Sequence, residues 1–173
     1  MVRYFSQVPM NKTPHIILKN FLPDEKRKKL IEDCKPFLHS LSKEGEKEFP
    51  AYQSDDDLRL YSQFNEIHFK ADIFVQEYLQ KKLIPDKSWF IMTQGKPNQC
   101  SMHNHPVDYV GVYYMNSHSS FINGTEFEEY GLVEAPENSM VIFPGHLYHT
   151  PPQFKSNEYF ERYTMSLNWN EVK

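Results

Sequence analysis

The sequence has few cysteines, no long apolar run and no excess of basic residues, and each shortage excludes a class of protein. Its two cysteines, Cys34 and Cys100, lie far apart and form no Cys-x-x-Cys pattern, so we expect reduced thiols and neither a disulfide framework nor a zinc ribbon. No segment approaches the roughly 18 consecutive apolar residues of a membrane span. Residues 1–10 lack the basic start and apolar stretch of a signal peptide. The net charge of -4 indicates no nucleic-acid partner. These features predict a soluble, cytoplasmic protein without membrane association.

The composition favours strands. Aromatic residues make up 15% of the 173 residues and there are 12 prolines, a mixture typical of short strands separated by turns. The length is that of one domain, and no internal repeat or low-complexity segment divides it. We expect an α+β, mainly β chain, with helical support over about 1–88 and a β core over about 89–173.

The first half of the chain carries the helix signals. An apolar strand at His15–Leu18 is followed by Pro23 and by Asp24, a residue suited to an N-cap, so a helix is expected from there. The basic run at 26–29 should lie on the solvated face of that helix. The polar segment 44–57 is interpreted as an exposed loop, and a second helix is expected from about Asn65 to Lys82.

In the second half, short apolar runs alternate with turn residues. Such a pattern predicts antiparallel strands of a sandwich or barrel. The expected strands are WFIMT (89–93), YVGVYYMN (109–116), TEFEEYGLVEA (125–135), SMVIF (139–143) and YFERYTMSLNW (159–169).

Three of the eight histidines occur where an expected strand meets a loop. His103 and His105 precede YVGVYYM, and His149 follows SMVIF. Two residues at i and i+2 of an extended segment project to the same side, and a third can arrive from a neighbouring strand. A facial set of three ligands would leave open positions on a bound metal. A His-x-His pair alone is more often incidental, so this interpretation depends on the rest of the chain.

The last strand supplies a second feature. Strand alternation puts Arg162, Thr164, Ser166 and Asn168 on one face. By itself this is an ordinary strand with its polar face in water. Combined with the histidines, the same face could present a guanidinium and a hydroxyl to a carboxylate.

Four segments in order resemble the 2-oxoglutarate and Fe(II)-dependent oxygenases, specifically their small stand-alone members and the prolyl-hydroxylase-like branch. The segments are IILKNFLPDEKRKKLIEDC, SMHNHPVDYVGVYYMN, SMVIFPGHLYHTPP and ERYTMSLN. The resemblance implies a double-stranded β-helix (jelly roll) with the N-terminal helices packed on one sheet. It also implies Fe(II) as cofactor, with 2-oxoglutarate and O2 consumed to hydroxylate a substrate, and succinate and CO2 as co-products.

Carried over to this chain, the resemblance implies that His103 and His149 are iron ligands. His105 stands where the usual His-x-Asp motif has its carboxylate, which is a departure from the family pattern. Asp108 is an alternative third ligand, and His146 is an alternative to His149.

The same resemblance assigns the co-substrate site. It implies that Arg162 binds the distal carboxylate of 2-oxoglutarate, helped by Thr164 and Tyr114.

Two other functions stay open: a three-histidine, cupin-like metal oxygenase or isomerase without 2-oxoglutarate, and a non-catalytic jelly-roll binding module. The primary substrate is not indicated, although segments 44–57 and 117–130 are expected to shape its pocket. The oligomeric state, including a homodimer, is also open. The remaining histidines, His15, His39, His68 and His118, are assigned core or surface roles.

Overall fold

A computed structural model describes residues 15–40, 51–94, 101–119, 121–152 and 160–173. The described strands are β1 (Ile16–Lys19), β2 (His39–Ser40), β3 (Ala51–Gln53), β4 (Leu83–Gln94), β5 (Tyr109–Tyr114), β6 (Gly124–Phe127), β7 (Gly131–Glu134), β8 (Ser139–Pro144), β9 (His149–Thr150) and β10 (Glu161–Glu171). The helices are α1 (Asp24–Cys34) and α2 (Asn65–Leu79), with short 3-10 turns at Lys35–Phe37, Leu58–Leu60 and Ser62–Phe64. The predictions for Cys100 and for residues 44–50 lie outside these ranges.

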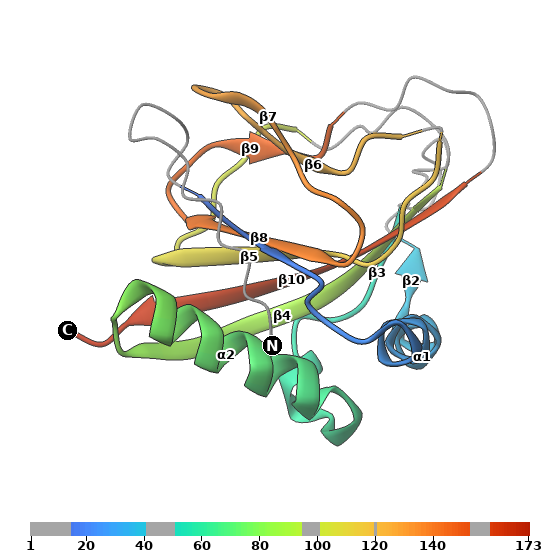
Figure 1. Cartoon of the computed structure of the whole chain (residues 1–173), viewed down its shortest axis with the longest axis horizontal. Helices are drawn as coiled ribbons and strands as arrows, with labels where there is room; N and C mark the ends of the chain where they lie inside the picture. The colour runs from blue at the N-terminus through green and yellow to red at the C-terminus, as the bar shows by residue number, and fades with distance from the viewer. Residues whose placement is uncertain (1–14, 41–50, 95–100, 120, 153–159) are drawn as a thin grey trace.

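The strands form two antiparallel sheets, which confirms the prediction of a mainly β chain. The larger sheet has seven strands in the order β1-β8-β5-β10-β4-β3-β2, and the smaller has three in the order β7-β6-β9. Figure 1 shows the two helices on one side of the large sheet and the small sheet on the other side. The large sheet is therefore the middle layer, and each of its faces is covered.

The central strand β10 shows how strand alternation separates the two faces. Its apolar side chains, including Met165, Leu167 and Trp169, pack in the core cluster that also contains the buried apolar residues of α1 and α2. Arg162 and Thr164 point to the opposite face, towards the small sheet. The predicted division of this strand is confirmed, but its polar face is buried rather than solvated, because the small sheet covers it.

Helix α1 corrects two expectations. It begins at Asp24 as predicted, yet the N-cap position is Pro23 and no side chain caps the helix. The basic run at 26–29 is not uniformly solvated, because Arg27 is buried and its guanidinium bonds to the Met115 carbonyl and to Glu137, the latter at 2.7 Å. A buried guanidinium is tolerated when it finds such partners.

Other boundaries also differ from the sequence-based expectations. Residues 51–53, expected in an exposed loop, form β3 and pair with β4. Strand β4 begins at Leu83, inside the region assigned to helical support, and α2 ends at Leu79 where Gln80 adopts a left-handed conformation with φ of 54°. In the part of the chain that the structure describes, no helix combines the length and apolarity that a bilayer span requires.

Candidate metal centre and adjoining cavity

The backbone joins two of the predicted ligands directly. His103 and His149 form an isolated antiparallel bridge. The His103 N–H donates to the His149 carbonyl at 3.0 Å, and the His149 N–H donates to the His103 carbonyl at 2.8 Å. Residues paired in this way project side chains on the same face of the ladder. The pairing therefore brings together two imidazoles that are distant in sequence.

Gly145 allows the loop that carries His105 to pack close to the other two histidines. The His105 N–H donates to the Gly145 carbonyl at 2.9 Å, and the Gly145 N–H donates to the Asp108 carbonyl at 3.0 Å. A Cβ on Gly145 would lie 2.1 Å from the Val107 carbonyl oxygen, far inside van der Waals contact. The loop carrying His105 can dock here only because residue 145 has no side chain.

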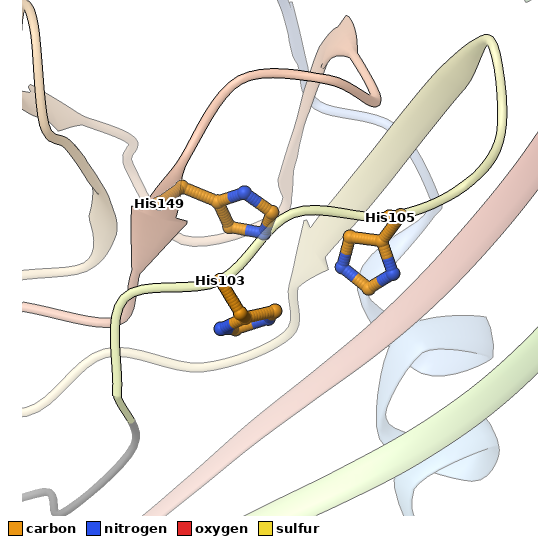
Figure 2. Close-up of side chains that lie close together, drawn as sticks. All are labelled: His103, His105 and His149. Atoms are coloured by element: carbon orange, nitrogen blue, oxygen red, sulfur yellow. The ribbon is translucent and has the colours of Figure 1, made fainter.

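The three imidazoles gather around one point, as Figure 2 shows. Their ring centroids are 4.6 Å apart for His103 and His149, and 5.2 Å for each of the two pairs that include His105. One nitrogen from each ring lies within 4.8 Å of the others. A set of three imidazole nitrogens suits a divalent transition metal such as iron, nickel or zinc.

Hydrogen bonds orient two of the three rings. The Nδ1 atom of His103 lies 2.9 Å from the Ser101 carbonyl, and Nδ1 of His149 lies 2.9 Å from the Leu147 carbonyl. A carbonyl only accepts, so each Nδ1 carries the proton and each Nε2 keeps its lone pair for a metal. This is the arrangement expected of metal-ligating histidines.

Burial keeps the site neutral. Removal from water lowers the pKa of both His105 and His149 to about 4, with the neighbouring imidazoles adding to the effect. Both rings are therefore unprotonated at neutral pH, the form that can bind a metal.

Neither alternative ligand joins the cluster. Asp108 is exposed, and its carboxylate accepts the Glu171 N–H at 2.7 Å. His146 is also exposed, and it lies with Asp108 along an open surface depression, which His105 lines as well. Within the described residues, the grouping of potential ligands is His103, His105 and His149.

The three histidines open onto a cavity of about 220 Å³ between the two sheets. Its other lining residues are Gln53, Trp89, Ile91, Val112, Tyr114, Gly124, Thr125, Thr150, Pro151, Arg162, Thr164 and Ser166. The residues assigned to the co-substrate thus line the same cavity as the candidate metal ligands. Segments 44–57 and 117–130 contribute to the wall through Gln53 and through Gly124 and Thr125.

Arg162 is the charged group in this lining. It is buried, its Nε atom donates to Asn123 Oδ1 at 3.2 Å, and one terminal nitrogen donates to the Gly124 carbonyl at 3.3 Å. The guanidinium lies 5.4 Å from the centre of the Tyr114 ring. Burial lowers its pKa, but a guanidinium stays charged. A cation held in a low-dielectric cavity attracts an anionic ligand strongly.

Tyr114 is positioned by a second polar contact. Its hydroxyl lies 2.5 Å from Thr125 Oγ1, and both residues line the cavity. Burial raises the pKa of Tyr114, so the phenol keeps its proton and can donate to a ligand.

Several lining residues were missed by the sequence analysis. Trp89 and Ile91 are two residues apart on β4, so the alternation of side chains along a strand could have predicted that they share a face. Gln53 lies in a segment interpreted as a loop. Asn123 orients Arg162 and lies in the irregular segment just before β6, where no periodic pattern marks it.

The layered fold is that of the 2-oxoglutarate/Fe(II) oxygenases, as the resemblance predicted. The chain matches a truncated collagen prolyl hydroxylase of Paramecium bursaria Chlorella virus-1 over 99% of each chain, with 13% identity and a TM-score of 0.65. It matches HygX from Streptomyces hygroscopicus, solved with nickel and 2-oxoglutarate bound, with 8% identity and a TM-score of 0.65 over 92% of this chain and 84% of that one. A prolyl-4-hydroxylase from Pseudomonas putida matches with 13% identity and a TM-score of 0.61, over 93% and 94%. No protein-family model and no curated protein matches the sequence.

Proposed function

We propose that this chain is an Fe(II)- and 2-oxoglutarate-dependent dioxygenase that hydroxylates a substrate still to be identified. The observation that carries the proposal is the placement of three inward-facing imidazoles and a buried guanidinium in the lining of one cavity. The architecture is assigned to a double-stranded β-helix in one domain, and the shared fold of solved oxygenases supports this assignment.

His103, His105 and His149 would hold the metal through one face of its coordination sphere. The carbonyls of Ser101 and Leu147 fix two of these rings and keep their Nε2 lone pairs available. Iron(II) bound there, with 2-oxoglutarate, would supply oxygen activation coupled to decarboxylation of the co-substrate to succinate.

Arg162 would pair with the distal carboxylate of 2-oxoglutarate through its planar fork of donors. Asn123 and Gly124 hold the guanidinium in place before the ligand arrives. Thr164 and Tyr114 would add hydroxyl donors from the same wall. The apolar lining, including Ile91 and Val112, excludes water and strengthens these contacts.

The histidine at position 105 changes the charge of the centre. Three neutral imidazoles leave a divalent cation with its full charge, whereas a carboxylate ligand would remove one unit. The dianion of 2-oxoglutarate can supply the missing negative charge, so the departure is compatible with this co-substrate.

The three-histidine donor set itself favours a second candidate, a cupin-like metal oxygenase or isomerase that uses no keto-acid. This candidate assigns no role to the guanidinium of Arg162.

An anaerobic titration of the Fe(II)-loaded protein with 2-oxoglutarate tests the proposal. Chelation of the metal by the keto-acid produces a weak visible charge-transfer band. We expect the band in the wild type and its loss in Arg162→Ala at the same 2-oxoglutarate concentration, with iron still bound. Ser166→Ala, on the same strand and face, is the matched control and should keep the band.

Two outcomes would contradict the proposal. Iron binding without a band would favour the second candidate. Absence of iron binding would instead favour the non-catalytic module.

A further inference from the structure

The third histidine differs from the other two in how its ring is supported. The rings of His103 and His149 each have a hydrogen bond from Nδ1 to a backbone carbonyl. In the part of the chain that the structure describes, the His105 ring nitrogens make no such bond. The ring contacts of His105 are with Trp89, His103 and His149.

Trp89 comes from a different element of the fold than the histidines. It lies on β4, half-buried, with its side chain on the cavity face, where it lines the cavity beside His105. The centroids of the indole and the imidazole are 5.6 Å apart, and the ring planes are inclined at 33°. This distance is within the range of favourable aromatic pairs.

We propose that Trp89 is a positioning residue, which holds the His105 imidazole in the orientation that completes the three-histidine centre. This inference rests on the metal site of the proposed function. The residues around a metal ligand usually orient it by a hydrogen bond, and here a packed indole on β4, a strand paired with β10 and β3, takes that role. Without it, rotation of the His105 side chain would be opposed mainly by the two imidazoles that themselves bind the metal.

The backbone hydrogen bond of His105 does not orient its imidazole ring, so a neighbouring side chain must do so. The His105 N–H is bonded to Gly145 at 2.9 Å, which fixes the position of the Cα atom. It does not fix the side-chain torsions, which decide where the ring nitrogens point. A loop residue with a fixed backbone and a free ring would bind a metal more weakly than a ring already in place.

The test is Co(II) binding to the full chain, with affinity measured by competition against a chelator and coordination followed by the visible d–d spectrum. Trp89→Ala should weaken Co(II) binding about tenfold, in the range found for residues that orient metal ligands, and should alter the spectrum. Trp89→Phe keeps an aromatic face and should restore both towards the wild type. Ile84→Ala, at an exposed position of the same strand and outside the cavity lining, is the control and should bind as the wild type does.

A double-mutant cycle separates positioning from general damage. In a His105→Asp background a carboxylate can supply the third ligand while no imidazole remains for the indole to pack on, so if Trp89 acts through His105, Trp89→Ala should have no further effect on Co(II) affinity there. An equal loss in that background would overturn the inference, as would unchanged binding by Trp89→Ala. Should Trp89→Ala fail to fold, Trp89→Phe and Trp89→Leu give the same comparison between an aromatic and an aliphatic side chain.

The experiment uses no 2-oxoglutarate, so the two proposals can fail independently. Wild-type Co(II) binding that is insensitive to Trp89 would overturn only this inference. Loss of the 2-oxoglutarate band alone would overturn the proposed function while the Trp89 effect remained. If the wild type binds no Co(II), the three-histidine centre itself is wrong.

Discussion

His103 and His149 face each other across a two-residue antiparallel bridge, with reciprocal backbone hydrogen bonds of 3.0 and 2.8 Å. The side chains that would bind a metal are therefore held by main-chain pairing between a loop and the short strand β9. Such pairing is insensitive to side-chain identity. Ligand substitutions at these positions should consequently remove metal binding while leaving the backbone in place.

The first prediction follows from this geometry. His149→Ala and His103→Ala should each abolish stoichiometric Fe(II) binding, because two imidazoles cannot complete the facial set. His146→Ala, three residues from His149 but exposed and outside the cluster, should bind iron normally. Anaerobic calorimetry measures all three, and normal loading of His149→Ala would show that the ligand assignment is wrong.

The docking of the His105 loop gives a second prediction. In Gly145→Ala, the added Cβ would lie 2.1 Å from the Val107 carbonyl oxygen, so the loop must move away and carry His105 with it. We expect a loss of metal affinity of at least about tenfold, comparable to the removal of a supporting contact.

Gly131→Ala is a suitable comparison for this variant. Gly131 has φ of 74° with open space around its Cα, so alanine there costs about 1 kcal/mol of backbone strain without a clash. It should lower the melting temperature but leave metal affinity unchanged. Equal metal affinity in Gly145→Ala and the wild type would argue against the role of this contact.

The adjacent tyrosines on β5 give a third prediction, because they face opposite sides of the large sheet. Tyr114→Phe removes a hydroxyl from the cavity and should weaken 2-oxoglutarate binding roughly tenfold, the value of a hydrogen bond to a charged group. Tyr113→Phe removes a hydroxyl that donates to Asn138 at 2.8 Å on the helix side. It should cost about 1 kcal/mol of stability and leave 2-oxoglutarate binding intact.

Titration of the charge-transfer band with 2-oxoglutarate gives the co-substrate affinity of the Tyr114→Phe and Tyr113→Phe variants. Chemical denaturation gives their free energies of unfolding. Similar effects of the two variants on 2-oxoglutarate affinity would contradict the assignment of Tyr114 to the co-substrate.

The fourth prediction concerns pH and a histidine outside the site. His68 is buried on α2, and its Nε2 lies 2.8 Å from the Ser88 hydroxyl. Burial, with a smaller contribution from Arg59, lowers its pKa to about 3. The unfolded chain has a pKa near 6.5 at this residue, so it takes up the proton first as the pH falls.

The free energy of unfolding should therefore decrease from pH 6.5 down to about 3, with a contribution from His68 of up to about 1.4 kcal/mol per pH unit. Above pH 6.5 His68 is neutral in both the folded and the unfolded chain, so it causes no loss in the free energy of unfolding there. His68→Gln should flatten the profile over this window, measured by urea denaturation of metal-free protein at several pH values. A profile parallel to that of the wild type would contradict the buried, neutral state of His68.

Some features of the fold could be predicted from the sequence because they depend on patterns among residues that are close together in the chain. The inward face of β10, with Arg162 and Thr164, follows from the alternation of side chains along an extended strand. The start of α1 at Asp24 follows from the preceding proline. The side of β5 on which Tyr114 lies is decided by the same alternation.

Other features depend on contacts between distant segments, which no local pattern encodes. Helical spacing puts Arg27 on the face of Leu30, Ile31 and Cys34. Its burial nevertheless depends on tertiary contacts, because a guanidinium is buried only where it finds partners, and Met115 and Glu137 lie far along the chain. Strand β3 was missed because three residues are too few to show a period, and pairing with β4 is what makes them a strand.

The sequence by itself determined the order of the candidate ligands, the polar face of β10 and the mainly β class, since each is a property of residues close together in the chain. The tertiary structure decided that His105 rather than Asp108 joins the cluster, because the contact with Gly145 sets the course of the loop. It also decided that Trp89 packs against His105, because that contact arises only where β4 lies beside the loop in the folded protein.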